Sequence, residues 1–152
     1  MDPDTKKDEF NEAIRKLFHG ETMERVAAAR KLGHLKEGRA VNLLIKAINK
    51  ENDAVVINRI IEVMGEIRNA KSTLSILKFL SEELEKPEEN QDKARLFLII
   101  DSLMKIGDKR ALQQLGILID SCDVDIRERT EKAFECIDVN WRENIKKLKI
   151  QN

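Results

Sequence analysis

Residues 32–45 read LGHLKEGRAVNLLI: an apolar helix end, a short polar turn, and a second apolar run that begins beside a basic residue. Related segments follow at residues 64–72, MGEIRNAKS, and at residues 104–111, MKIGDKRA. In each of them an apolar residue is followed four places later by Arg or Lys. This recurrence indicates an internal repeat of about thirty residues.

The apolar residues that mark these turns are Leu35, Ile67, Ile106 and, more weakly, Ile137, at spacings of 32, 39 and 31 residues. Such spacings are typical of stacked helical hairpins, because one hairpin cannot bury its apolar face alone. The longest interval contains EELEKPEENQ at residues 82–91, an acidic stretch with a helix-breaking proline. We therefore predict an inserted loop there, and treat it as a candidate contact site.

Apolar residues recur with the helical period of 3.6 in both helices of each unit. We predict a single all-α domain over residues 1–152, with an N-terminal helix at 4–19 and repeats at about 21–52, 53–91, 92–122 and 123–152. The fold class is an α-α superhelix of about four helical hairpins with terminal capping helices. Its expected core includes Val26, Ala28, Ala29, Leu32, Val41, Leu44, Ile45, Ile48, Ile57, Ile60, Ile61, Met64, Ile76, Leu77, Leu80, Leu96, Ile99, Ile100, Leu103, Leu112, Leu115, Leu118, Ile119, Ile126, Ala133 and Phe134.

Helix ends are also marked in the sequence. Gly20 follows the apolar pattern of the first helix, where a left-handed residue is favoured. Trp141 and Ile145 lie on one face of the last segment with Leu148, which suits a helix that covers the end of the stack. Side-chain oxygens that could cap helix N-termini belong to Thr22, Asp53, Asp92, Asp108 and Asp123.

The composition narrows the class of protein. Charged residues make up 37% of the chain and aromatic residues 4%, and the 28 basic and 28 acidic residues cancel. No strong global field therefore attracts nucleic acid or an anionic membrane. Cys122 and Cys136 form no pair with metal-site or secreted-protein spacing, so we expect buried thiols in a reducing compartment. The polar N-terminus and the lack of a long apolar run predict a soluble, cytoplasmic protein without a membrane span.

The segment at residues 32–45 resembles the short HEAT-like repeats of the type also found in phycobilisome lyase subunits, which read roughly Leu-Gly-x-Ile-Gly-Asp-x-Arg-Ala before an apolar helix. The resemblance extends over about residues 21–138 and weakens toward the last unit. It implies a superhelix whose second helices line a concave, protein-binding surface. It also implies a structural ladder of basic residues that faces Glu37 and Asp108 and ties the repeats together; the ladder comprises Arg39, Lys71 and Arg110.

The best candidates for partner contact are polar positions on the second helices that the core pattern leaves free. These are Asn42, Lys46, Ser75, Lys78, Gln113 and Gln114. We expect a non-enzymatic scaffold or adaptor that binds a protein partner of unknown identity, with no cofactor and no small-molecule substrate.

Two other functions stay open. The first is binding of a nucleic-acid backbone by a basic stripe of Arg39, Lys46, Lys71, Lys78 and Arg110, against which stand the zero net charge and the few aromatic residues. The second is a lyase-type or chaperone subunit that acts with an obligate partner. Metal catalysis is not expected, because the only two histidines occur as His-Gly and His-Leu pairs rather than in a ligand pattern.

Overall fold

The computed structural model describes residues 2–35 and 38–151, and this part of the chain is built from helices. The α-helices are α1 (Pro3–His19), α2 (Thr22–Leu35), α3 (Ala40–Lys50), α4 (Ala54–Ile67), α5 (Thr73–Leu84), α6 (Lys93–Ile106), α7 (Leu112–Leu115), α8 (Val124–Ile137) and α9 (Trp141–Gln151). Short 3-10 helices are η1 (Ala70–Ser72), η2 (Glu88–Asn90), η3 (Lys109–Ala111) and η4 (Gly116–Asp120). The all-α expectation is confirmed.

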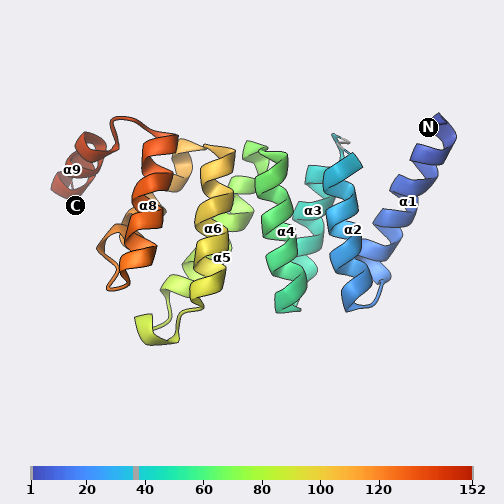
Figure 1. Ribbon diagram of the computed structural model, residues 1–152, viewed down its shortest axis with the longest axis horizontal. Coiled ribbons are helices and arrows are strands. Elements are labelled where there is room, and N and C mark those ends of the chain that lie inside the picture. The colour runs from blue at the N-terminus through green and yellow to red at the C-terminus, as the bar shows by residue number, and fades with distance from the viewer. Residues whose placement is uncertain (1, 36–37, 152) are drawn as a thin grey trace.

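The helices form two layers (Figure 1). The first helices of the hairpins, α2, α4, α6 and α8, lie side by side in one row, which α1 extends at the N-terminal end. The second helices α3 and α5 lie behind that row, and α7 continues their layer. Each hairpin therefore packs against its neighbours, as expected of a helical repeat.

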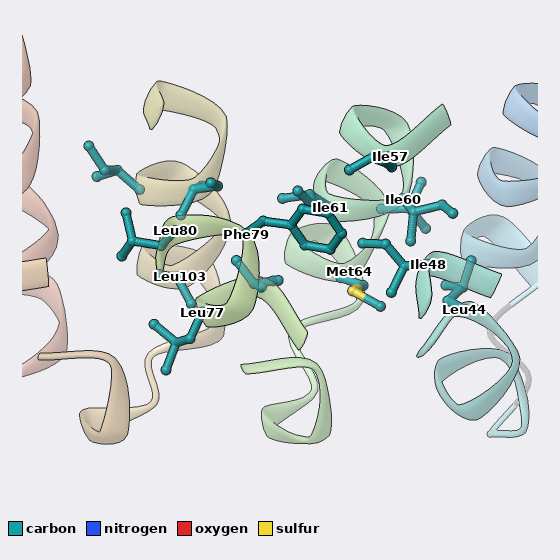
Figure 2. Packing of buried hydrophobic residues seen from close by; sticks show 14 of the residues in the cluster. Leu44, Ile48, Ile57, Ile60, Ile61, Met64, Leu77, Phe79, Leu80 and Leu103 are labelled. Atoms are coloured by element: carbon teal, nitrogen blue, oxygen red, sulfur yellow. The ribbon is translucent and has the colours of Figure 1, made fainter. Parts of the chain in front are cut away.

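The core runs between the two layers (Figure 2). Most residues expected in the core are buried, and several of the larger ones, including Leu44, Ile60, Met64 and Leu80, are completely inaccessible to solvent. Burying one such side chain stabilises the fold by roughly 1.5–3 kcal/mol. Ile45, Leu112 and Ile119 are half-buried and pack against the edge of the core. The 3.6-residue period was therefore sufficient to identify the core.

The first-helix layer is the more closely packed of the two. Two glycines permit this approach: a Cβ added to Gly33 would lie 2.7 Å from Val63 Cγ1, and one added to Gly65 would lie 2.8 Å from Ser102 Cα. Second helices touch one another far less. The expectation that the second helices line a concave surface stays a prediction.

Four of the five predicted N-caps are confirmed. Asp53, Asp92, Asp108 and Asp123 each accept a hydrogen bond from a backbone N–H at the start of the next helix. The prediction for Thr22 is wrong, because Thr22 is itself the first residue of α2 and its hydroxyl donates to Asp53 Oδ2 at 3.3 Å. Thr22 thus connects the first two repeats.

The left-handed conformation predicted at Gly20 is also wrong. Gly20 is extended, with φ −77° and ψ 169°, and a glycine fits there because an added Cβ would lie 2.6 Å from the carbonyl oxygen of Lys16. The positive φ values belong to Arg68, at 63°, and Gly107, at 74°, which end α4 and α6 at equivalent positions.

Replacing Arg68 with Gly is expected to raise the free energy of unfolding by about 1 kcal/mol, because a left-handed backbone is strained for a residue with a Cβ. Gly107→Ala at the equivalent helix end is the reciprocal change and should lower it by a similar amount. Urea denaturation of the two variants measures both values. A loss of stability in Arg68→Gly would show that the Arg68 side chain contributes more than its backbone costs.

The acidic insertion is anchored by a buried carboxylate. Glu83, on the last turn of α5, is only 2% exposed, and its Oε1 and Oε2 accept hydrogen bonds from Lys86 Nζ at 2.8 Å and from Asp92 N at 2.9 Å. The connection passes through η2 to the N-cap of α6. Glu83 therefore holds both ends of the insertion in place.

The last hairpin ends as expected at Trp141, which is buried and whose ring lies 5.2 Å from that of Phe134. Ile145 packs on the same core, whereas the side chain of Leu148 lies outside the described part. Both cysteines are exposed, so the prediction of buried thiols is wrong. Among the described helices, none is both long and apolar enough to cross a lipid bilayer.

Candidate functional site

Corresponding positions on the second helices form two rows that cross the repeats. In each helix the buried residues lie on one face, so residues four places apart on the opposite face point away from the core. One row comprises Asn42, Leu74 and Gln113, and the other comprises Lys46, Lys78 and Ile117. All six are exposed, and we call them the second-helix face.

Two of these six residues are large and apolar. Leu74 is 62% exposed and Ile117 is 59% exposed. Single exposed apolar residues are ordinary, but Leu74 lies one turn from Lys78 on α5, and Ile117, in η4 after α7, occupies the position equivalent to Lys46 and Lys78. Sequence reasoning missed them because it sought polar positions. The signal in the sequence was an apolar residue at a position that is polar in the other repeats. Leu74 is equivalent to Asn42 and Gln113, and Ile117 is equivalent to Lys46 and Lys78.

The other two predicted contact residues are not freely available. Ser75 is half-buried. Gln114 is half-buried as well, and its Nε2 donates to the carbonyl oxygen of Leu77 at 2.9 Å and to the hydroxyl of Ser81. The expectation that Gln114 is free for a partner is therefore wrong, because its amide joins α7 to α5.

The second-helix layer has a strong charge bias. The second helices with their 3-10 turns, at residues 39–50, 70–84 and 109–120, contain seven basic residues and three acidic ones, Glu82, Glu83 and Asp120, although the whole chain is neutral. The bases are Arg39, Lys46, Lys50, Lys71, Lys78, Lys109 and Arg110. The rest of the chain must therefore carry an equal excess of negative charge.

Positive charge on the first-helix layer, in contrast, is paired locally. Arg59 lies 3.1 Å from Glu62, and Arg129 lies 3.0 Å from Asp101. Lys93 contacts Asp123 at 2.9 Å, which helps to lower the pKa of that carboxyl. On the second-helix face, Lys46 and Lys78 form no ion pair with any residue that the structure describes. Their charge stays available to a partner.

The basic ladder makes different contacts at each step. The Arg39 guanidinium lies over the ring of Phe10, 4.7 Å from its centroid, and so contacts α1. Arg110 donates to the carbonyl oxygen of Ala70 at 3.1 Å, which joins the third repeat to the second. No hydrogen bond or ion pair of the Lys71 side chain involves the described residues. Glu37, the acidic residue expected to face the first step, lies outside the described residues.

Arg110 also holds Asp108 with hydrogen bonds of 2.7–3.2 Å from its guanidinium. These bonds, with one from the Arg110 N–H, lower the pKa of Asp108 to about 2. Asp108 is the N-cap of η3, so its charge also suits the helix start that it caps. The charges of Arg110 and Asp108 are therefore paired with each other within the turn.

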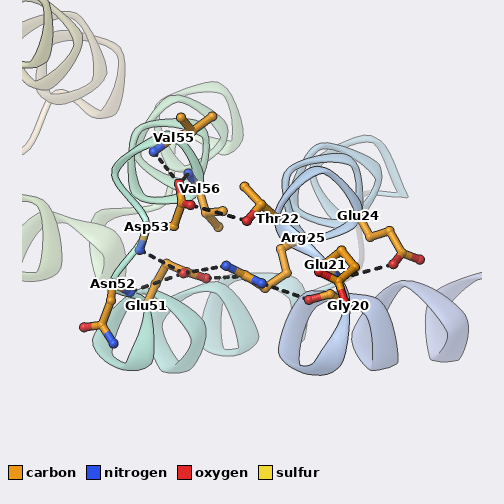
Figure 3. Close-up of polar contacts among 10 residues, drawn as sticks. All are labelled: Gly20, Glu21, Thr22, Glu24, Arg25, Glu51, Asn52, Asp53, Val55 and Val56. Carbon is orange, nitrogen blue, oxygen red and sulfur yellow. Dashed lines mark hydrogen bonds and ion pairs between the residues drawn. The ribbon is translucent and has the colours of Figure 1, made fainter.

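A further polar network joins the first two repeats (Figure 3). Arg25 Nε lies 2.9 Å from Glu51 Oε2, Arg25 Nη2 lies 3.2 Å from Glu51 Oε1, and Arg25 Nη1 donates to the carbonyl oxygen of Gly20 at 2.8 Å. Glu51 also accepts from the backbone N–H groups of Asn52 and Asp53. One guanidinium therefore links the ends of α1 and α3 to α2 and the start of α4.

Within residues 2–35 and 38–151, no cluster of three or more His, Cys, Asp or Glu side chains could hold a metal ion. His19 and His34 are both exposed and lie at the ends of α1 and α2. The residues that stand out are thus the apolar and basic ones of the second-helix face.

Comparison with known proteins adds one match. Residues 24–50 match the family model described as PBS lyase HEAT-like repeat. This segment spans most of α2, the turn and α3, which form the first hairpin. No curated protein matches the chain. The matched hairpin is followed by stacked helical pairs of the same pattern, which is the architecture of a HEAT-like repeat protein.

Proposed function

We propose that this protein is a non-enzymatic scaffold that binds a protein partner through its second-helix face. The observation that carries the proposal is the exposure of Leu74 and Ile117 at repeat positions that are otherwise polar, on a face whose two lysines have no ion-pair partner among the described residues. Apolar side chains of this size lose contact with water when a partner covers them, which gives roughly 25 cal/mol per Å² buried. The lysines supply orientation and specificity.

The helical stack supports this function by presenting the contact residues on a rigid surface. Leu74 and Lys78 lie one turn apart on α5, whose other face is buried in the core. Gln114 ties α7 to α5, and Ile117 lies in η4, which follows α7 directly. Since these backbones are already ordered, a partner that docks loses little of its binding free energy to ordering the scaffold.

Affinity purification from native extract tests the proposal. The double variant Leu74→Asp/Ile117→Asp should lose a partner that the unchanged protein retains, while its melting temperature stays within a few degrees. The matched control is Met23→Asp/Val55→Asp, which alters two equally exposed apolar residues on the first-helix layer. Retention of the same partner by the first variant and its loss from the control would contradict the proposal.

Nucleic-acid binding is the second candidate, and the charge bias favours it, because an excess of seven bases over three acids on the second-helix layer suits a phosphate backbone. It predicts duplex binding that falls by orders of magnitude between 50 and 200 mM salt, as is usual for multiple phosphate contacts. Gel-shift measurements at these two concentrations distinguish it from protein binding.

A lyase-type or chaperone subunit is the third candidate, and it rests on the name of the matched repeat model. The matched residues include Leu32, Gly33, Ala40 and Leu44, which are packing positions of the hairpin. Such positions determine the fold more than the chemistry. This role requires an obligate partner, so the purification experiment addresses it as well.

A further inference from the structure

The second-helix face has a chemical complement, and we infer that its partner is an acidic peptide segment with at least two large apolar side chains. This inference rests on the proposed function, since it names the chemistry of the partner for the same surface. It follows from the pattern of charge, from the position of the apolar residues and from the boundary of the basic area.

The pattern of charge comes first. Across the three consecutive second helices and their 3-10 turns, seven bases face only three acids, Glu82, Glu83 and Asp120, and this excess repels a basic segment and attracts an acidic one. Arg110 is neutralised by Asp108, but Lys46, Lys71, Lys78 and Lys109 have no ion pair with the described residues. An acidic partner therefore gains attraction without displacing an existing ion pair.

The apolar residues are bracketed by cations. On α5, Leu74 lies between Lys71, three residues before it, and Lys78, four residues after it, so all three share one face. Ile117 occupies the row that contains Lys46 and Lys78. A partner that fits must alternate carboxylates with apolar side chains, because an acid alone would leave Leu74 and Ile117 uncovered.

The boundary of the basic area argues against a long polyanion. The C-terminal end of α5 leads into Glu82, Glu85, Glu88 and Glu89, all exposed, and these follow Lys78 within about three turns of chain. A nucleic-acid duplex laid along α5 would bring phosphates against this acidic insertion. A short peptide can end before it. Leu74 and Ile117 also offer no hydrogen bond to a phosphate.

Selection of random twelve-residue peptides displayed on phage against the full immobilised chain tests the inference. The expected result is enrichment of sequences with net negative charge and at least two Leu, Ile, Val, Met, Phe, Tyr or Trp residues. A synthetic copy of an enriched peptide should lose tenfold or more in affinity with Lys71→Glu/Lys78→Glu, and likewise with Leu74→Asp. The control Met23→Asp should change the affinity less than twofold.

Different failures point to different errors. One such outcome is a set of selected peptides that carry no excess of acidic residues and lose affinity with Leu74→Asp but not with Lys71→Glu/Lys78→Glu. Such peptides bind the second-helix face, so they would overturn the inference and leave the proposed function standing. Peptides insensitive to both changes would overturn both. Duplex DNA of twenty base pairs that binds more tightly than every selected peptide, and loses binding with Lys71→Glu/Lys78→Glu but not with Leu74→Asp, would assign the face to nucleic acid. Circular dichroism melting of each variant excludes loss of fold as the cause.

Discussion

Substituting Gly65 with Ala is expected to destabilise the protein by about 3 kcal/mol, the upper part of the range for an overpacked core. The added Cβ would lie 2.7 Å from Ser102 Oγ and 2.8 Å from Ser102 Cα and Cβ. Because one of these contacts is to backbone, a side-chain rotation is not enough and α4 must move away from α6. Urea denaturation followed by circular dichroism measures the change.

Two other glycines are matched controls for this effect. Gly116 has helical backbone angles and nothing within 4 Å of an added Cβ, so Gly116→Ala should stabilise the protein by roughly 0.5–1 kcal/mol. The change in stability caused by Gly33→Ala should lie between those of the other two variants, because the close contact of its added Cβ is with the Val63 side chain rather than with backbone. A Gly65→Ala variant as stable as Gly116→Ala would show that the first helices are not held in close contact.

Removing the Arg25 side chain is expected to lower the free energy of unfolding by about 2–3 kcal/mol, which is the usual contribution of charge-assisted hydrogen bonds in a partly buried site. The Arg25 and Glu51 side chains are 21% and 9% exposed, so water replaces the lost guanidinium only in part. Arg25→Ala would leave the Gly20 carbonyl oxygen without this donor and Glu51 without its opposite charge. Thermal and urea unfolding of the variant provide the measurement.

The pair Arg15 and Glu12 is the control, since it has a similar short contact of 2.6 Å but lies on the open surface of α1. Arg15→Ala should change stability far less than Arg25→Ala, because exposed ion pairs contribute little. A double-mutant cycle between Arg25 and Glu51 isolates their interaction. Coupling no larger than that between Arg15 and Glu12 would contradict a structural role for the network.

The hairpins and their core were predictable because burial of apolar residues imposes a strict period on a helical sequence. Positions such as Leu44, Ile60 and Phe134 follow that period and are buried. Aspartates at helix starts were predictable for a local reason as well, since an N-cap bonds to N–H groups two or three residues away. Asp53 and Asp123 both do so.

The features that the sequence did not predict depend on contacts between hairpins. Thr22 has a residue type suited to an N-cap, but its hydroxyl bonds to Asp53 in the next repeat. Gln114 falls on a polar position, but its amide reaches α5. Arg25 and Glu51 are 26 residues apart, and no local pattern pairs them. The tight packing of the first helices depends likewise on the close approach at Gly33 and Gly65.

The lysines of the second-helix face also bear on how fast this face would meet an acidic partner. Although the whole chain is neutral, residues 39–50, 70–84 and 109–120 carry seven bases against three acids, and this local excess creates a positive potential near the face. An approaching anionic molecule then turns the second-helix face toward itself before the surfaces touch, within roughly a Debye length of 8 Å at physiological ionic strength. Diffusional encounters are therefore already oriented, and the association rate constant rises although the net charge is zero.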